Sequence, residues 1–237
     1  MSIIALTIGI NNYSPSLSTK LYPPLGAAIP DATRFTAFLR EKIGVPSQNI
    51  TILNGPQATQ QGILAAFNAV LKKQAETKGA GNIVIYFAGH GAKVKVGNEE
   101  EEVMCTFDGG AIGVKDLTRM VASSSGGVVV FMDCCHSGGI LRGDDEEEDT
   151  EYITRSVRGT IVLPDLKKGP VQKIDFGGGK GDYVFLAACG KDQVAKETLS
   201  SPQGGLFTSS LLAALAETNW KDLTYTSLAQ RIRMPVW

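Results

Sequence analysis

Two apolar runs without polar alternation place the strongest constraint on the fold. The first, I-V-I-Y-F, lies within residues 82–88, and the second, V-V-V-F-M, covers residues 128–132. A strand with one face in water alternates apolar and polar residues, whereas a strand covered on both faces does not. Both runs therefore predict central strands of a parallel sheet. Other strand-sized apolar runs lie at residues 3–10, 49–53 and 183–188, and a short one at 102–107.

Segments with helical periodicity separate these runs, which is the pattern of an α/β fold. Asp31 opens a helix with Phe35, Phe38 and Leu39 on one face, and Gly44 stops it. The last predicted helix starts so close to the end of the chain that a terminal strand is expected to be missing. The remaining helices are predicted from residue 63 to about residue 77, around 117–121, over 207–215 and from 228 on.

Composition and charge exclude several classes of protein. Hydrophobic residues make up 43% of the 237 residues, and the mean hydropathy is +0.01, as in a folded globular chain. The net charge of -1 does not favour a nucleic-acid or anionic-membrane surface. No apolar run approaches the roughly 18 residues of a membrane span, and residues 1–13 lack the basic start of a signal peptide. We therefore expect a cytoplasmic monomer that binds neither nucleic acid nor membrane.

The cysteines indicate a reducing compartment. Cys105, Cys134, Cys135 and Cys189 are too few, and too irregularly spaced, for a disulfide framework in a chain of this length. Two of them are adjacent in sequence, so they cannot easily join one such framework.

We predict a single domain over residues 1–237, divided by a linker. Residues 1–140 form a first segment, 141–181 an exposed linker without periodicity, and 182–237 a second, smaller segment. Ten of the 24 acidic residues fall in two runs, 99–102 and 144–149, which is typical of solvated loops or cation sites.

A histidine and a cysteine follow the two central strands. His90 comes directly after the first, and Cys135 follows the second 45 residues later. The carboxyl ends of neighbouring parallel strands meet at one edge of a sheet, so both side chains are expected in one crevice. An imidazole that accepts a thiol proton makes the sulfur a nucleophile. Backbone N–H groups near Gly91 and Cys135 are expected to hold the oxyanion.

Other interpretations of these residues remain open. Either residue alone is more often structural, the cysteine as a small buried side chain and the histidine in a turn. A zinc site would need ligand spacings such as C-x-x-C, which the chain lacks. A serine hydrolase would need a G-x-S-x-G motif, which is also absent.

The motifs V-V-V-F-M-D-C-C-H-S-G-G and I-V-I-Y-F-A-G-H-G resemble those of type I metacaspases, which are caspase-like cysteine peptidases. The opening A-L-T-I-G-I-N-N-Y and the later F-L-A-A-C and G-L-F-T occur in the family's order, so the resemblance covers nearly the whole chain. It implies a caspase-like α/β fold, a parallel sheet with helices on both faces. It also implies that His90 is the catalytic histidine and that Cys135, rather than Cys134, is the nucleophile.

The resemblance further implies an acidic S1 pocket that accepts arginine or lysine. Asp31 and Asp133 match its two acidic positions. Gly91 and Ala88, on either side of His90 in the sequence, are further candidates for substrate binding, and Ala88 replaces the family's usual serine. A carboxylate pair attracts a cationic side chain and repels an acidic one. The other interpretation of Asp31 is a helix N-cap.

Calcium activation is a second implication of the family. Glu101, Glu102, Asp144 and Asp145 could supply oxygen ligands, although Arg142 stands where a family carboxylate is usual. These carboxylates could equally be solvated loop charges. No cofactor is required for the chemistry itself.

Autoprocessing follows if a peptidase specific for basic residues carries such residues in an exposed linker. The other interpretation is a basic segment that offsets its acidic neighbours. The candidate cleavage residues are Arg142, Arg155, Arg158, Lys167, Lys168, Lys173 and Lys180.

The predicted function is thus a cysteine endopeptidase that cuts proteins and peptides after arginine or lysine. One rival is a catalytically silent caspase-like scaffold for protein assembly. Another is a peptidase of the same fold that prefers Asn or Asp, which Asp31 and Asp133 disfavour.

Overall fold

A computed structural model describes residues 2–77, 81–96, 99–134, 152–157, 183–188, 195–198, 204–217 and 224–233. Its centre is a parallel five-stranded sheet in the order β2-β1-β3-β7-β9. The two runs without alternation form β3 and β7, which pair in register from Ile83–Val128 to Ala88–Asp133. The five strands are β1 (Ser2–Gly9), β2 (Ile50–Asn54), β3 (Gly81–Ala88), β7 (Val128–Asp133) and β9 (Tyr183–Ala187).

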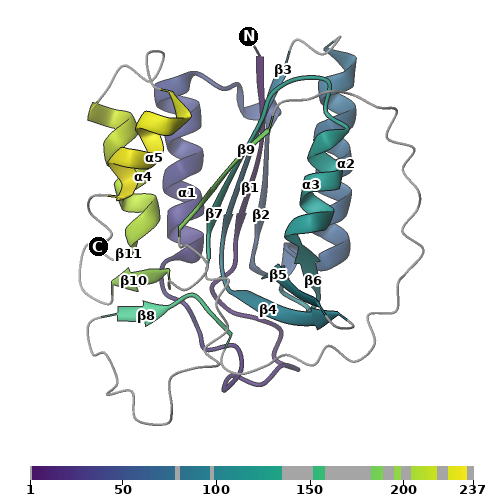
Figure 1. Cartoon of the computed structure of the whole chain (residues 1–237), viewed down its shortest axis with the longest axis vertical. Helices are drawn as coiled ribbons and strands as arrows, with labels where there is room; N and C mark the ends of the chain where they lie inside the picture. The colour runs from purple at the N-terminus through teal and green to yellow at the C-terminus, as the bar shows by residue number, and fades with distance from the viewer. Residues whose placement is uncertain are drawn as a thin grey trace.

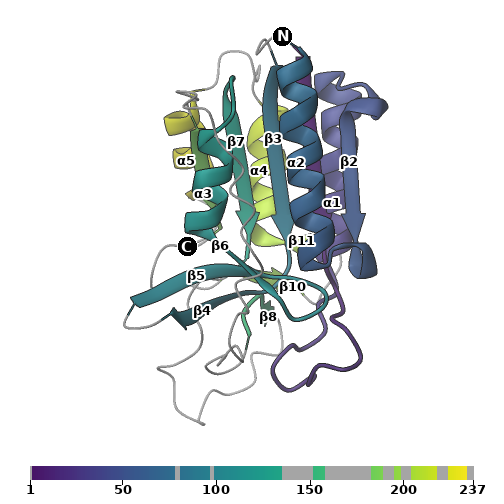
Figure 2. The same cartoon turned by 90° about the vertical axis from the view of Figure 1, so that its right-hand side faces the viewer.

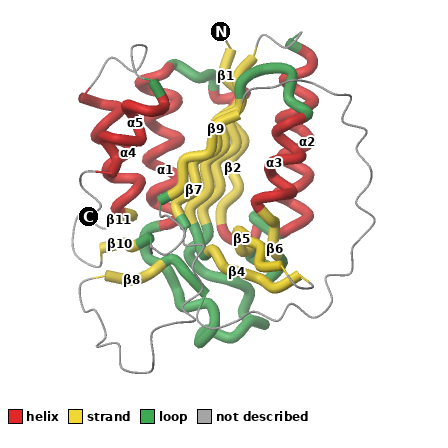
Figure 3. Tube along the Cα trace, viewed as in Figure 1, coloured by secondary structure: helices red, strands yellow, loops and turns green. Residues whose placement is uncertain are grey.

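Helices cover both faces of this sheet, as Figures 1 and 3 show. One layer contains α1 (Ala28–Phe38), α4 (Leu206–Glu217) and α5 (Tyr225–Arg233). The other contains α2 (Gln60–Glu76) and α3 (Val114–Ala122). The predicted three-layer arrangement, a parallel sheet with helices on both faces, is confirmed.

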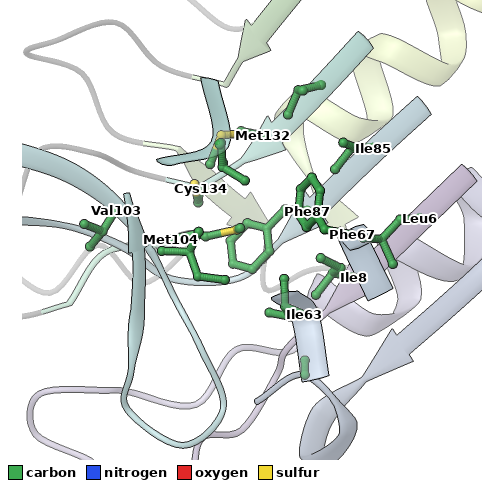
Figure 4. Close-up of a cluster of buried hydrophobic side chains, with 14 of the residues drawn as sticks. Leu6, Ile8, Ile63, Phe67, Ile85, Phe87, Val103, Met104, Met132 and Cys134 are labelled. Carbon is green, nitrogen blue, oxygen red and sulfur yellow. The ribbon is translucent and has the colours of Figure 1, made fainter. Parts of the chain in front are cut away.

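The missing alternation in β3 has a direct structural reason. Ile83, Ile85 and Phe87 pack into the core beneath α2 and α3, part of which Figure 4 shows. Val84 and Tyr86 point to the opposite core, beneath α1 and α4. Each face of the strand is buried, so each position must be apolar or fully hydrogen-bonded.

Two small antiparallel sheets lie near the carboxyl ends of the central strands, at the bottom of Figure 2. The first contains β4 (Gly91–Val96), β5 (Glu99–Cys105) and β6 (Ala111–Gly113), and the second β8 (Tyr152–Thr154), β10 (Lys196–Thr198) and β11 (Gly204–Gly205). The acidic run 99–102 was expected in a loop, and that expectation is wrong. It forms part of β5, where the register sets Glu102 opposite Lys93, an opposite-charge pairing that a two-stranded ladder favours.

The boundaries of α1 also differ from the prediction. The helix begins at Ala28, with Ala27 as N-cap, so Asp31 lies inside the first turn and is not the cap. A π-helical turn, η1 (Leu39–Ile43), extends it, and Gly44 ends it at φ 82°, as its position predicted. Short 3-10 helices flank β2, namely η2 (Ser47–Asn49) and η3 (Gly55–Gln57).

A second correction concerns the linker. Residues 152–157, expected in an exposed segment, contain β8 and pack against the body of the fold. Arg155 is 0% exposed. In the part of the chain that the structure describes, no helix is long and apolar enough to cross a membrane.

Candidate active site

His90 is held between β3 and β4 by its backbone. Its N–H donates to the Tyr13 hydroxyl oxygen at 2.7 Å, and its carbonyl accepts from the Cys105 N–H at 2.9 Å. The imidazole stacks on the Tyr13 ring with 5.2 Å between centroids. Burial raises the pKa of Tyr13, so this hydroxyl keeps its proton. The histidine therefore has a fixed position at the carboxyl edge of the sheet.

The Pro23 carbonyl oxygen orients the imidazole. It lies 2.7 Å from Nε2 of His90, and because a carbonyl can only accept, Nε2 carries the hydrogen in the neutral ring. Nδ1 is then the basic nitrogen, and it has no hydrogen-bond partner among the described residues. Sequence reasoning found no group that orients His90, because a backbone carbonyl has no side-chain signature.

His90 is neutral at physiological pH. Burial lowers its pKa from 6.5 to about 4, although the backbone carbonyls of Pro23 and Arg155 act in the opposite direction. A neutral imidazole with a free Nδ1 can accept a proton from a thiol.

This lowered pKa predicts how stability depends on pH. The unfolded chain, with the ordinary value of 6.5, binds the His90 proton more tightly than the folded chain. The contribution of His90 to the free energy of unfolding should be constant above about pH 6.5 and should fall by about 3 kcal/mol as the pH drops to about 4. Urea titrations at several pH values should show this fall in wild type but not in His90→Gln. Equal pH dependence in the two proteins would contradict the prediction.

Asp31 and Asp133, which the resemblance assigns to an S1 pocket, converge on a residue of the same chain. Asp31 comes from α1 and Asp133 ends β7, and both are buried. The Arg155 guanidinium lies between them, with Nη1 2.9 Å from Asp133 Oδ2 and Nη2 in contact with Asp31 Oδ2. Three charged side chains from distant segments thus form one buried cluster.

Glu197 of β10 adds a third carboxylate. Its Oε2 lies 3.2 Å from Nε of Arg155, and its two oxygens accept the N–H groups of Gly26 and Ala27 at 2.6 and 3.3 Å. Sequence reasoning missed it, since a single glutamate in K-E-T carries no motif. Only the pairing of β10 with β8 brings it to the cluster.

The charges of the cluster depend on one another. Burial would lower the pKa of Arg155, but the neighbouring carboxylates, Asp133 first, outweigh it, so the pKa is raised and the guanidinium stays charged. Burial raises the pKa of Asp133, which Arg155 opposes. A cation in this position therefore favours the ionised form of Asp133.

Gly205 allows the backbone to pass directly over the carboxylates. Its N–H donates to Asp31 Oδ2 at 2.8 Å, and a Cβ at this position would lie 2.5 Å from Asp133 Oδ2. Thr208, at the start of α4, donates its hydroxyl and its N–H to the same Asp133 oxygen. A larger residue at 205 would displace the buried carboxylates.

Gly91 and Ala88 occupy the edge next to His90. The Gly91 N–H donates to the Arg155 carbonyl at 3.1 Å, and the Gly91 carbonyl accepts from the Val157 N–H at 3.2 Å. Ala88 is buried at the end of β3, opposite Asp133 in the register.

The predicted nucleophile, Cys135, lies outside the described residues. Its neighbour Cys134 is buried in the core with Met132 and Met104, as Figure 4 shows. His90 and Cys135 each follow the paired residues Ala88 and Asp133 by two positions. The adjacent parallel pairing on which the prediction depended is thus present.

The predicted calcium ligands are only partly described. Glu101 and Glu102 lie in β5, and the Glu101 carboxylate packs against Gly113, where α3 begins. Asp144 and Asp145 lie outside the described residues. Within the described ranges, no three His, Cys, Asp or Glu side chains are grouped as metal ligands.

Of the cleavage candidates, only Arg155 is described. It was expected in exposed chain, and this expectation is wrong, because Arg155 is 0% exposed and pairs with Asp31, Asp133 and Glu197 inside the fold. The other candidates, Arg142, Arg158, Lys167, Lys168, Lys173 and Lys180, lie outside the described residues.

Comparison with known proteins decides the family. A caspase domain profile matches residues 2–236. The chain belongs to the caspase domain family. No curated protein matches its sequence significantly.

Solved structures confirm the fold of this caspase domain. Protein GSU0716 from Geobacter sulfurreducens superposes with a TM-score of 0.65 at 21% identity, covering 99% of this chain and 90% of that one. The Drosophila initiator caspase Dronc superposes with a TM-score of 0.56 at 10% identity, covering 99% and 72%. At these identities the similarity concerns the fold alone. Membership of the family indicates a domain of the cysteine peptidase type that acts on proteins.

Proposed function

We propose that this caspase domain is a metacaspase-like cysteine endopeptidase that cuts after arginine or lysine. One observation carries the specificity: three buried carboxylates beside His90 enclose a guanidinium. The same pocket would repel an acidic P1 side chain. Its cytoplasmic location and monomeric state stay predictions from the sequence.

The described geometry supports a dyad mechanism. Nδ1 of His90 accepts the proton of the Cys135 thiol, and the thiolate attacks the carbonyl carbon of the P1 residue. The Gly91 N–H donates to the carbonyl oxygen as it becomes an oxyanion. His90 returns the proton to the departing amine, which leaves a thioester at Cys135. Water, deprotonated by His90, hydrolyses the thioester and regenerates the thiol.

Arginine fits the pocket better than lysine. Nε and Nη2 of Arg155 reach Glu197, Nη1 reaches Asp133 and Nη2 also reaches Asp31. A lysine ammonium has three donors at a single nitrogen and cannot span these carboxylates in the same way. Both should be cut, arginine faster.

Two fluorogenic peptides that differ only at P1, arginine against aspartate, test this function. Wild type should favour the arginine peptide by at least about 10³-fold, because a site built for one polar group strongly rejects a mismatched one. Cys135→Ala should lose this hydrolysis. Preference for aspartate would contradict the specificity, and silence on both peptides would favour the scaffold.

We also propose calcium activation, through Glu101 and Glu102 with the predicted ligands Asp144 and Asp145. Turnover of the arginine peptide should rise from EDTA to about 1 mM calcium, and Glu101→Gln should weaken the response. Identical turnover in the two buffers would rule out calcium activation.

A further inference from the structure

The Pro23 carbonyl that orients His90 belongs to loop 22–27, the last part of the connection from β1 to α1. Because the proline ring fixes φ, the two successive prolines, Pro23 and Pro24, leave this part of the loop little freedom to change shape. Leu25, the next residue, is buried. The position of the Pro23 carbonyl therefore depends on the contacts that hold the rest of the loop.

Asn11, just after β1, makes three of these contacts. Its backbone carbonyl accepts from the Leu25 N–H at 2.8 Å, and its side-chain Nδ2 donates to the Gly26 carbonyl at 3.1 Å. Its Oδ1 accepts the Ile29 N–H at 2.7 Å, one of the N–H groups in the first turn of α1 that have no acceptor within the helix. All three contacts are uncharged, so Asn11 holds the loop in the same way whatever binds nearby.

Glu197 holds the same loop from the acidic pocket, the three-carboxylate cluster around the Arg155 guanidinium. Its side chain is buried, its Oε1 accepts the Gly26 N–H at 2.6 Å, and its Oε2 accepts the Ala27 N–H at 3.3 Å. Oε2 also lies 3.2 Å from Nε of Arg155. One carboxylate thus connects the guanidinium in the pocket to the loop that orients His90.

The contact between Glu197 and the loop depends on a cation in the pocket. A buried carboxylate that loses its partner costs several kcal/mol, about 3–5. Without a guanidinium, Glu197 would also share the pocket with the like charges of Asp31 and Asp133. Movement of the Glu197 side chain toward solvent would relieve both costs, and the N–H groups of Gly26 and Ala27 would then lose their acceptor.

We propose that Asn11 and Glu197 are positioning residues for His90, and that Glu197 acts only while a guanidinium occupies the acidic pocket. This inference rests on the proposed function. Binding of a basic P1 side chain then places the Pro23 carbonyl against Nε2, which leaves Nδ1 as the nitrogen that accepts a proton. In the intact chain Arg155 supplies the guanidinium. Binding energy from the P1 side chain is thus used to orient the base, so it affects kcat as well as KM.

Long-range ¹H–¹⁵N spectra of the full chain near neutral pH, where the imidazole is uncharged, test the positioning without any measurement of activity. The chain has two histidines, so His136→Gln assigns the ring signals of His90. In wild type the hydrogen should lie on Nε2. In Glu197→Gln and in Asn11→Ala the two ring-nitrogen signals should shift toward each other, because the hydrogen is then shared between Nε2 and Nδ1.

The matched controls are Glu41→Gln and Asn12→Ala. Glu41 pairs with Arg40 at the surface, and Asn12 is exposed beside Asn11 in the sequence. Both variants should keep the wild-type ring signals. His90 signals that do not move in Glu197→Gln, or do not move in Asn11→Ala, would overturn the inference.

Peptides with P1 arginine or its neutral analogue citrulline test the coupling in wild type, so the test does not depend on the folding of a variant. The citrulline peptide should have a kcat about tenfold lower as well as a higher KM, because a neutral side chain fills the pocket without holding Glu197. In Asn11→Ala kcat should fall by the same factor for both peptides. In Glu197→Gln the difference in kcat between the peptides should disappear.

The outcomes separate this inference from the proposed function. A wild type that cuts the arginine peptide, but differs between the two peptides in KM alone, would overturn the inference and leave the proposed function standing. A wild type that cuts neither peptide would reject both.

Discussion

Asp31→Asn is expected to lower kcat/KM for an arginine peptide by about 10²- to 10³-fold, because truncating one partner of a buried charge pair costs about 2–5 kcal/mol. Oδ2 of Asp31 accepts from Arg155 and from the Gly205 N–H, and Oδ1 accepts from Arg34. Both oxygens face donors. Whichever way the asparagine amide is turned, its NH₂ group points at another N–H, so the variant loses a charge and gains a donor–donor contact.

Peptides with P1 arginine or its neutral analogue citrulline separate this effect from a general loss of activity. Wild type should have a much higher kcat/KM for the arginine peptide than for the citrulline peptide, and the ratio of the two values should be smaller in Asp31→Asn. The matched control is Asp116→Asn, which alters a similar i,i+3 pair with Arg119 on α3, where Asp116 is 56% exposed. Surface pairs of this kind contribute little. If Asp31→Asn and wild type had the same ratio of kcat/KM for the arginine and citrulline peptides, Asp31 would have no role in binding the P1 side chain.

His90→Ala is expected to lower kcat by about 10²- to 10⁴-fold with little change in KM, the usual range for loss of a general base. The imidazole contacts the Pro23 carbonyl and the Tyr13 ring rather than the carboxylates of the proposed P1 pocket. In the variant the remaining rate should increase with pH up to about 8.5, because only the spontaneously formed thiolate then reacts. A variant with wild-type kcat, or with the wild-type pH profile, would exclude His90 as the base.

Tyr13 holds the backbone of His90, and its substitution is expected to lower kcat less than the substitution of His90 itself. Tyr13→Phe removes the hydroxyl that accepts the His90 N–H, so kcat should fall about tenfold with KM unchanged, as expected for losing one buried hydrogen bond. Tyr225→Phe, at a tyrosine that is 49% exposed on α5, is the control and should keep the wild-type kcat. Equal kcat values in the two variants would show that the Tyr13 hydroxyl has no positioning role.

The central sheet could be predicted because a strand that is buried on both faces has an apolar sequence without polar alternation. Residues such as Val84 and Ile85 face opposite cores, and neither can be polar without a partner. The hairpin of β4 and β5 could not be predicted in the same way. Its register sets charged residues such as Lys93 and Glu102 opposite each other, and in sequence these charges look like a solvated loop.

The candidate site, too, could be predicted from the sequence only in part. Strand topology predicted that His90 lies at the carboxyl edge of the sheet, and the family resemblance paired Asp31 with Asp133. Glu197 and the burial of Arg155 were not foreseen. A charged residue in a segment without periodicity is predicted to be solvated, because the sequence pattern does not reveal an ion-pair partner from a distant part of the chain.

The walls of the acidic pocket lie far apart in the chain, with Asp31 and Gly205 separated by 174 residues. During translation the histidine and both aspartates emerge from the ribosome well before β10 and the start of α4. At about 5–20 residues per second this interval is on the order of ten seconds. Throughout it the growing chain lacks Glu197 and the Gly205 N–H, so the complete pocket cannot yet assemble around any guanidinium. The order of synthesis thus delays assembly of the three-carboxylate cluster until β10 and the start of α4 have left the ribosome.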